Sequence, residues 1–153
     1  MDTEIGEAAD TRAVVIMVGV DGTDTSLRAA AYAAGLAARQ NADLVAVHIM
    51  HTPALSSGLT PQDALIAAGL QQCQTELDDQ LRDRLTTDAA TTGTHLTFRS
   101  AHGDPYTELV RLAEQIHPDL LVVGASAHRG HRLIGSLAVR LVRLGRWPVT
   151  VVP

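Results

Sequence analysis

The chain has 153 residues, an apolar share of 46% and a formal net charge of −5, which is typical of one globular domain. The acidic balance, without a long basic run, argues against a nucleic-acid binder, and no apolar run reaches the roughly 18 residues that a membrane span needs. The single cysteine, Cys73, rules out an intramolecular disulfide. Residues 1–12 are acidic and lack an apolar signal core, so we expect a disordered tail before a single cytoplasmic domain at 13–153.

Strand-like and helix-like patterns alternate along the whole chain. Continuous apolar runs indicate strands that are covered on both faces, whereas Ala-rich or periodic segments indicate helices. In chain order we expect a strand at 13–20, a helix at 27–40 capped by Thr25 or Ser26, a strand at 43–50, a loop at 53–60, a helix at 61–91, a strand at 94–101, and then a helix at 106–116, a strand at 119–124, a helix at 135–144 and a strand at 148–152.

Two of these elements carry a further expectation. The alternating pattern of 94–101 favours an edge strand that is less covered than the others. The helix at 61–91 should be amphipathic, with Cys73 half-buried as a small apolar side chain. The apolar positions that recur at helical spacing in it are Leu65, Ala68, Cys73, Leu77, Leu81 and Leu85.

Strands that alternate with helices predict an α/β fold with a parallel sheet and helices on both faces. For five strands we expect the order 3-2-1-4-5, which is Rossmann-like. The first and fourth strands are then neighbours at the point where the strand order reverses. Ligands of open α/β sheets bind there, outside the carboxyl ends of the strands.

Several residues at that point are suited to binding a phosphorylated ligand. Gly124 allows a sharp turn after its strand, and Gly135 with Ser136 can offer backbone N–H groups and a hydroxyl at a helix start. Arg129 in the intervening loop can bind phosphate oxygens. Asp21 can accept hydrogen bonds from a ribose or hold a cation, or it can simply bond its own turn. A glycine and a capping serine also occur in α/β domains that bind no phosphate.

Three histidines lie near the ends of the second and third strands. His48, His51 and His102, with Asp21, offer a candidate metal site. Their spacing matches no ligand pattern, so ordinary polar residues at strand ends are the favoured interpretation.

Segments spread over 13–153 together resemble the universal stress protein family. Each segment is common by itself, but their occurrence in this order is specific. The segments are 18–23 (VGVDGT), 45–49 (VAVHI), 103–105 (GDP), 121–126 (LVVGAS), 135–138 (GSLA) and 147–153 (WPVTVVP).

The resemblance implies ATP or another adenine nucleotide as ligand, optionally with Mg²⁺ or Mn²⁺. Val20, Ile49 and Val123 would line the base, and Asp21 would meet the ribose or adenine. ATP-binding members carry Gly, two residues, Gly, nine residues, then Gly and Ser or Thr. The positions that correspond to this loop are Gly124, Ala127 in place of the second glycine, Arg129, Gly130 as a substitute on a different loop path, Gly135, Ser136 and Leu137.

Two functions follow from this pattern. The chain is expected to be a regulatory module that binds an adenine nucleotide between the first and fourth strands. The span from Gly124 to Gly135 is two residues shorter than the family pattern, and Ala127 replaces a glycine. The alternative is therefore a stress protein that binds no nucleotide and acts through dimerisation and protein partners. No nucleophile with its base is evident, so we expect no enzyme, although slow hydrolysis of bound ATP stays open.

The apolar pattern of the last strand predicts a homodimer. Val149–Val152 is a short apolar strand at the expected sheet edge, and an uncovered edge invites pairing. The resemblance implies that two copies of this strand meet across a two-fold axis. Pro148 and Pro153 offer the alternative of an edge that is simply capped.

Overall fold

The computed structural model describes residues 13–51, 60–125 and 136–153. These form five strands and four helices in strict alternation. The strands are β1 (Val15–Val20), β2 (Asp43–Met50), β3 (Leu96–His102), β4 (Leu120–Gly124) and β5 (Val149–Val152). The helices are α1 (Asp24–Gln40), α2 (Pro61–Thr92), α3 (Pro105–Ile116) and α4 (Ser136–Leu144). The expected tail at 1–12 and most of the expected loop at 53–60 lie outside the described residues.

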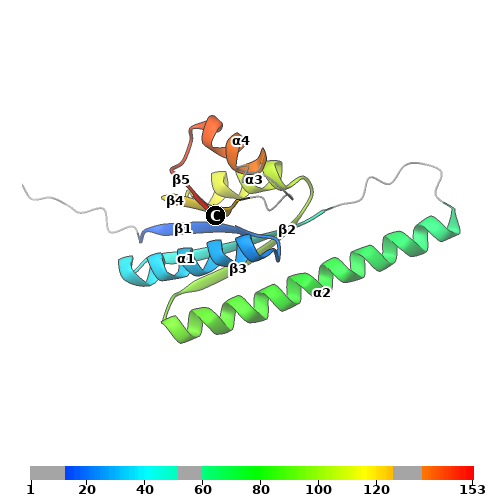
Figure 1. Ribbon diagram of the computed structural model, residues 1–153, viewed down its shortest axis with the longest axis horizontal. Helices are drawn as coiled ribbons and strands as arrows, with labels where there is room; N and C mark the ends of the chain where they lie inside the picture. Colours follow the sequence, from blue (N-terminus) through cyan, green and yellow to red (C-terminus); the bar gives the residue numbers. More distant parts are fainter. Residues whose placement is uncertain (1–12, 52–59, 126–135) are drawn as a thin grey trace, which may run out of the picture.

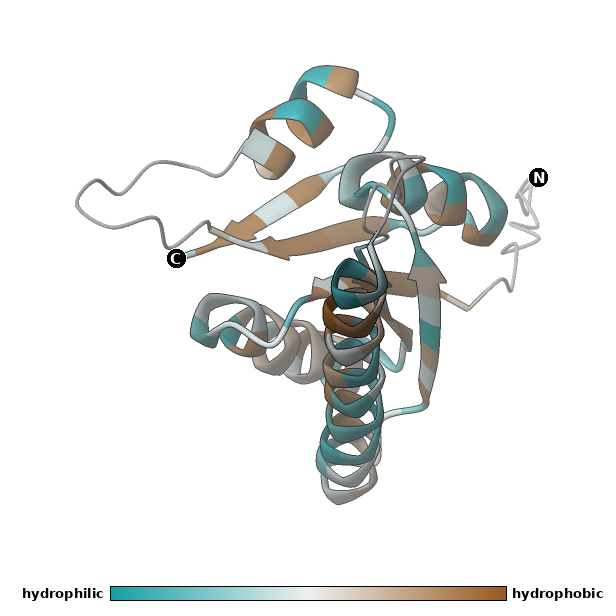
Figure 2. Cartoon of the chain, turned by 90° about the vertical axis from the view of Figure 1, so that its right-hand side faces the viewer, coloured by the Kyte–Doolittle hydropathy of each residue, from teal (hydrophilic) through white to brown (hydrophobic). Residues whose placement is uncertain are grey.

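The sheet has the predicted order, β3-β2-β1-β4-β5, and every pairing is parallel. Helices α1 and α2 cover one face and α3 and α4 cover the other (Figure 1). Because crossovers cover both faces, the central strands read as continuous apolar runs. Ile16, Met17 and Val18 of β1 are fully buried. Figure 2 shows the same division, with apolar strands and mixed helix surfaces.

The start of α1 differs from the expectation. The helix begins at Asp24 and its N-cap is Thr23, whose side chain accepts a hydrogen bond from the Ser26 backbone. The predicted caps, Thr25 and Ser26, lie inside the first turn and are buried. The helix starts earlier because Gly22 takes a left-handed φ of +83° that completes the turn straight after β1.

Helix α2 begins where it was predicted to begin and has a complete capping box. Thr60 and Asp63 exchange side-chain and backbone hydrogen bonds, and Pro61 stands in the first turn. Leu77, Leu81 and Leu85 pack against the sheet.

The first half of α2 has no such cover. Leu65, Ile66 and Leu70 are 74%, 63% and 52% exposed. The helix extends well beyond the sheet in Figure 1. Cys73 is exposed, so the prediction of a half-buried thiol is wrong. The apolar stripe continues past the point where the sheet ends, and at Cys73 no described residue remains to bury it.

Edge strand β3 is less covered than the central strands, as predicted, since only Ala101 in it is buried and Arg99, Ser100 and His102 are exposed. Strand β5 forms the opposite edge and all four of its residues are half-buried. Within the described ranges, no helix is long and apolar enough to cross a bilayer.

Candidate functional site

A cavity of about 550 Å³ lies at the carboxyl ends of β1, β2 and β4, on the α3–α4 face of the sheet. Its floor is apolar, with Val47 and Ile49 from β2 and Val123 from β4. Leu109 of α3 and Leu137 of α4 extend this apolar surface. The position is the switch point of the sheet, where β1 has β2 on one side and β4 on the other.

The predicted site residues that the structure describes all line this one cavity. The fold thus brings together segments that are up to 117 positions apart, as Val20 and Leu137 are. These residues are Val20, Asp21, Ile49, Val123, Gly124, Ser136 and Leu137. The other four, Ala127, Arg129, Gly130 and Gly135, lie outside the described residues. The roles of all eleven in binding stay predictions.

Asp21 builds its own turn and also faces the cavity. Its Oδ1 accepts hydrogen bonds from the Thr23 backbone N at 3.0 Å and from Thr23 Oγ1 at 2.6 Å. Its backbone N–H donates to Ser26 Oγ at 3.2 Å. Partial desolvation alone would raise the pKa of the Asp21 carboxyl. The hydrogen bonds from Thr23 and Ser26, with the nearby His48, outweigh that effect and hold the pKa below its usual range. The carboxyl is therefore ionised at neutral pH and acts as a fixed acceptor.

Gly124 serves helix packing as well as the cavity wall. A Cβ placed on it would lie 2.7 Å from the carbonyl carbon of Thr25 and 2.8 Å from the backbone N of Ser26. The end of β4 and the first turn of α1 therefore touch backbone to backbone. The sequence suggested a sharp turn at this glycine, and the structure adds a close approach to α1.

The cavity also has polar residues that the sequence reasoning missed. Thr23, Thr25 and Ser26 come from the start of α1, Asp104 from the start of α3, and Arg140 from α4. Asp104 caps α3 through Thr107, and this bonding lowers the pKa of its carboxyl. The Gly-Asp-Pro segment at 103–105, just before the predicted helix, was the available signal for Asp104. Nothing local marks Arg140, because α4 reaches the cavity only through the tertiary fold.

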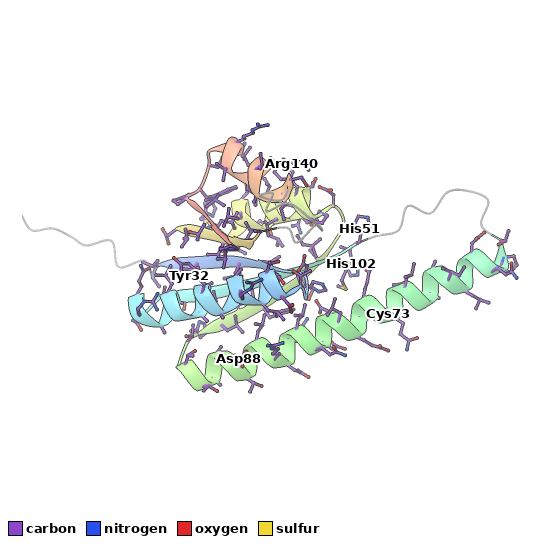
Figure 3. The ribbon with its side chains drawn as sticks, viewed as in Figure 1. Tyr32, His51, Cys73, Asp88, His102 and Arg140 are labelled. Atoms are coloured by element: carbon purple, nitrogen blue, oxygen red, sulfur yellow. The ribbon has the colours of Figure 1, made fainter. Side chains whose placement is uncertain are left out.

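The three histidines do not form the candidate metal site. His48 is 4% exposed, and its Nδ1–H donates to Asp78 Oδ1 on α2 at 2.7 Å. Ser100 and Arg82 also donate to the Asp78 carboxylate. Labelled His51 and His102 lie near the ends of β2 and β3 (Figure 3). Among the described residues, no group of three His, Cys, Asp or Glu side chains is placed to hold a metal ion.

The cavity has the size of a small-molecule site and a lining that is partly apolar and partly polar. Its volume lies within the ~300–1,000 Å³ usual for small-molecule sites. The apolar floor suits a base, the Asp21 carboxylate suits hydroxyl donors, and the Ser136 hydroxyl suits phosphate oxygens. A Mg²⁺ ion would take most of its ligands from phosphates and water, as it commonly does beside nucleotides.

A parallel sheet of this order with a cavity at its switch point defines the Rossmann-like α/β class. Solved structures of that class superpose on the chain. The universal stress protein UspA from Lactobacillus plantarum has a TM-score of 0.80 at 24% identity and covers 94% of this chain and 100% of its own. A universal stress protein in complex with cAMP has a TM-score of 0.68 at 29% identity and covers 92% of this chain and 97% of its own.

Sequence comparison gives the same family. The family model of the universal stress protein family matches residues 15–153, and the chain belongs to that family. Universal stress protein MJ0531 of Methanocaldococcus jannaschii is 28% identical over 143 residues, which are 90% of this chain and 80% of the relative.

Proposed function

We propose that this protein is a regulatory module that binds an adenine nucleotide in the switch-point cavity. The observation that carries the proposal is the cavity itself, in which an apolar floor and an ionised Asp21 come together at the strand ends. The relative at 29% identity that is in complex with cAMP supports an adenine ligand. The Asp21 carboxylate and the Thr23 hydroxyl in the lining bond to each other within the turn after β1, and binding rather than turnover is the activity that we propose.

The first test identifies the ligand. The purified protein is denatured, and the released small molecules are identified by mass spectrometry. AMP, ATP and cAMP are then titrated calorimetrically, with and without Mg²⁺. We expect micromolar binding of at least one of them, and the absence of any binding heat would contradict the proposal.

The second test locates the site at Asp21. In Asp21→Asn the Oδ1 acceptor that holds the turn is kept and the charge is lost. We expect the affinity for the nucleotide to fall about tenfold, because a charged hydrogen-bond acceptor for the ribose is lost. The matched control is Asp24→Asn, which removes the same charge from the exposed first turn of α1, outside the cavity lining. Equal losses in the two variants would place the binding elsewhere.

A second candidate function is action through dimerisation and protein partners without a nucleotide. The observation in its favour is the edge of β5, whose outer side pairs with none of the described residues. The shortened loop between Gly124 and Gly135 supports it as well. Homodimerisation through Val149–Val152 is compatible with both functions. The ligand search above separates them, since a nucleotide-free protein that forms dimers supports only the second.

A further inference from the structure

One cation in the cavity wall has no role so far. Arg140 is the sole arginine among the described lining residues. Its guanidinium carbon lies 3.6 Å from the centre of the Tyr106 ring, so the planar group stacks on the aromatic face. Tyr106 itself lines the cavity from α3. The stack therefore joins α3 to α4 on the cavity side, and Figure 3 labels Arg140 on α4, above the sheet.

The Arg140 guanidinium is not neutralised by a carboxylate of the described residues. Other arginines form ion pairs, as Arg82 does with Asp78, Arg111 with Glu108 and Arg146 with Glu114. Arg140 forms no such pair with any residue in the described part of the chain. The nearby Asp104 uses its Oδ2 to accept hydrogen bonds from Thr107 N and Oγ1 at 2.9 Å and 2.8 Å. Together with the hydrogen bonds from Thr107, the charge of Arg140 helps to lower the pKa of the Asp104 carboxyl, but the two groups form no ion pair. The N–H donors of the guanidinium are therefore available to a ligand.

The Arg140 side chain is expected to lean toward the end of the cavity that Ser136 lines. Residues 136 and 140 are one turn apart, so they lie on one face of α4. Long side chains on a helix lean toward its N-terminus, which brings the Arg140 side chain back over the first turn. Ser136, in that turn, lines the same cavity.

We propose that Arg140, held flat against Tyr106 in the cavity wall, binds the phosphate of the nucleotide and makes the protein select phosphorylated adenine nucleotides over adenosine. This inference rests on the proposed function, because it assigns one residue of the same cavity. A guanidinium that is stacked in advance loses little side-chain freedom when it binds a phosphate, and its donors match two oxygens at once. The Asp21 carboxylate would repel the phosphate, so the two charged groups also fix which way round the ligand lies.

The test compares AMP with adenosine by calorimetric titration of the full chain. In Arg140→Gln we expect the affinity for AMP to fall about ten- to a hundredfold, because charge-assisted hydrogen bonds are lost. The affinity for adenosine should stay within about twofold of its original value, since adenosine carries no phosphate to bind. The matched control is Arg143→Gln, which removes the same charge from the same helix at an exposed position outside the cavity lining. It should leave both affinities unchanged.

Two further variants separate charge from geometry. Arg140→Lys keeps the charge and loses the planar fork, so it should recover only part of the AMP affinity. Tyr106→Leu removes the ring and leaves the arginine, and it should weaken AMP more than adenosine. Thermal melts of each variant verify that it is folded.

The outcomes are distinct. A selective loss for AMP in Arg140→Gln, absent in Arg143→Gln, supports the proposal. Equal losses for AMP and adenosine, or no loss, overturn it and leave the proposed function standing. The same holds if the original protein binds adenosine as tightly as AMP. An original protein that binds none of AMP, ATP and cAMP overturns the phosphate role of Arg140 and the proposed function together.

Discussion

At the scale of single residues, the contact between Gly124 and α1 leaves the least room for a larger side chain. An added methyl group would lie 2.7–2.8 Å from the Thr25 and Ser26 backbone, which cannot yield as a flexible side chain can. We expect Gly124→Ala to lower the free energy of unfolding by about 1–3 kcal/mol, as overpacking does. Denaturant titration measures the change.

The control for that substitution is Gly69→Ala. Gly69 lies within α2 with no atom within 4 Å of an added Cβ. Alanine favours a helix over glycine by about 0.5–1 kcal/mol, so this variant should be as stable as the original or more so. If both variants lost stability equally, the backbone contact would not be the cause.

The sequence alone could not assign the role of Asp21. The sequence allowed two interpretations, a ligand contact or a turn that bonds to itself. The structure shows the turn through Thr23 and also shows Asp21 on the cavity wall. A single carboxylate can do both, because its oxygens together accept several hydrogen bonds. Arg140, in contrast, had no local signal at all.

At the scale of elements, α2 is fastened to the sheet by a polar cluster around the buried Asp78. Asp78 accepts hydrogen bonds from His48 of β2, Ser100 of β3 and Arg82 one turn along α2. The Arg82 guanidinium also stacks on Phe98, 4.9 Å from its ring centre. Burial would raise the pKa of the Asp78 carboxyl, but the hydrogen bonds from His48, Ser100 and Arg82 outweigh it and lower that pKa.

This lowered pKa predicts how stability depends on pH. A carboxyl whose pKa is lower in the folded state contributes stability above its unfolded pKa near 4. That contribution is lost as the pH falls through the lower, folded pKa. Asp78→Asn should therefore be less stable at neutral pH, by about 3 kcal/mol for a broken buried pair. Its stability should also fall less steeply in acid.

Denaturant midpoints between about pH 3 and pH 7 measure both effects. The control is Asp79→Asn, which changes the exposed neighbouring carboxylate on α2 and should follow the original protein at every pH. A parallel acid dependence in Asp78→Asn and the original protein would assign the acid sensitivity to other groups.

The prediction of elements succeeded where local chemistry decides and failed where tertiary surroundings decide. The apolar runs marked the central strands well, and the Gly-Asp-Pro segment at 103–105 lies at the start of α3, whereas the cap of α1 was expected at Thr25 or Ser26 and lies at Thr23. The period of α2 identified an apolar face, but it could not say how much of that face the sheet would cover. Leu65 and Leu81 have the same sequence pattern, yet Leu65 is 74% exposed and Leu81 is 4% exposed.

At the scale of the whole molecule, the strand order followed from the alternation of strands and helices and the preference for right-handed crossovers. That order leaves β5 as an edge. Pro148 O and Val152 O accept hydrogen bonds from Leu121 and Ala125, so the backbone groups at these alternate positions face β4. With a period of two, the backbone groups of Val149 and Val151 face away from the sheet. This edge is suited to a second copy of the strand.

We expect the protein to be a dimer in solution and Thr150→Glu to make it monomeric. Thr150 is half-buried and is the polar residue of β5, so the change replaces no apolar side chain of the core. Two glutamates near the two-fold axis would repel each other. Light scattering should give the mass of one chain for the variant and twice that mass for the original.

Thr97→Glu makes the same change on β3, at the other edge of the sheet, and should remain dimeric. A monomeric original protein, or a dimer that survives Thr150→Glu, would show that β5 is not the interface.

Because half of α2 is uncovered, a small tilt of its packed half would be amplified at its first turn. Its 32 residues form a rod about 48 Å long, and its packed residues, from Leu77 onward, fix only the second half. A tilt of about 5° there would move the first turn, some 24 Å away, by about 2 Å. His48 bonds to Asp78 on this helix, and it also lies close enough to Asp21 in the cavity to help lower the pKa of the Asp21 carboxyl. Cys73, the chain's one thiol, is exposed on the uncovered part of this helix, so a spectroscopic label attached there would report any such tilt.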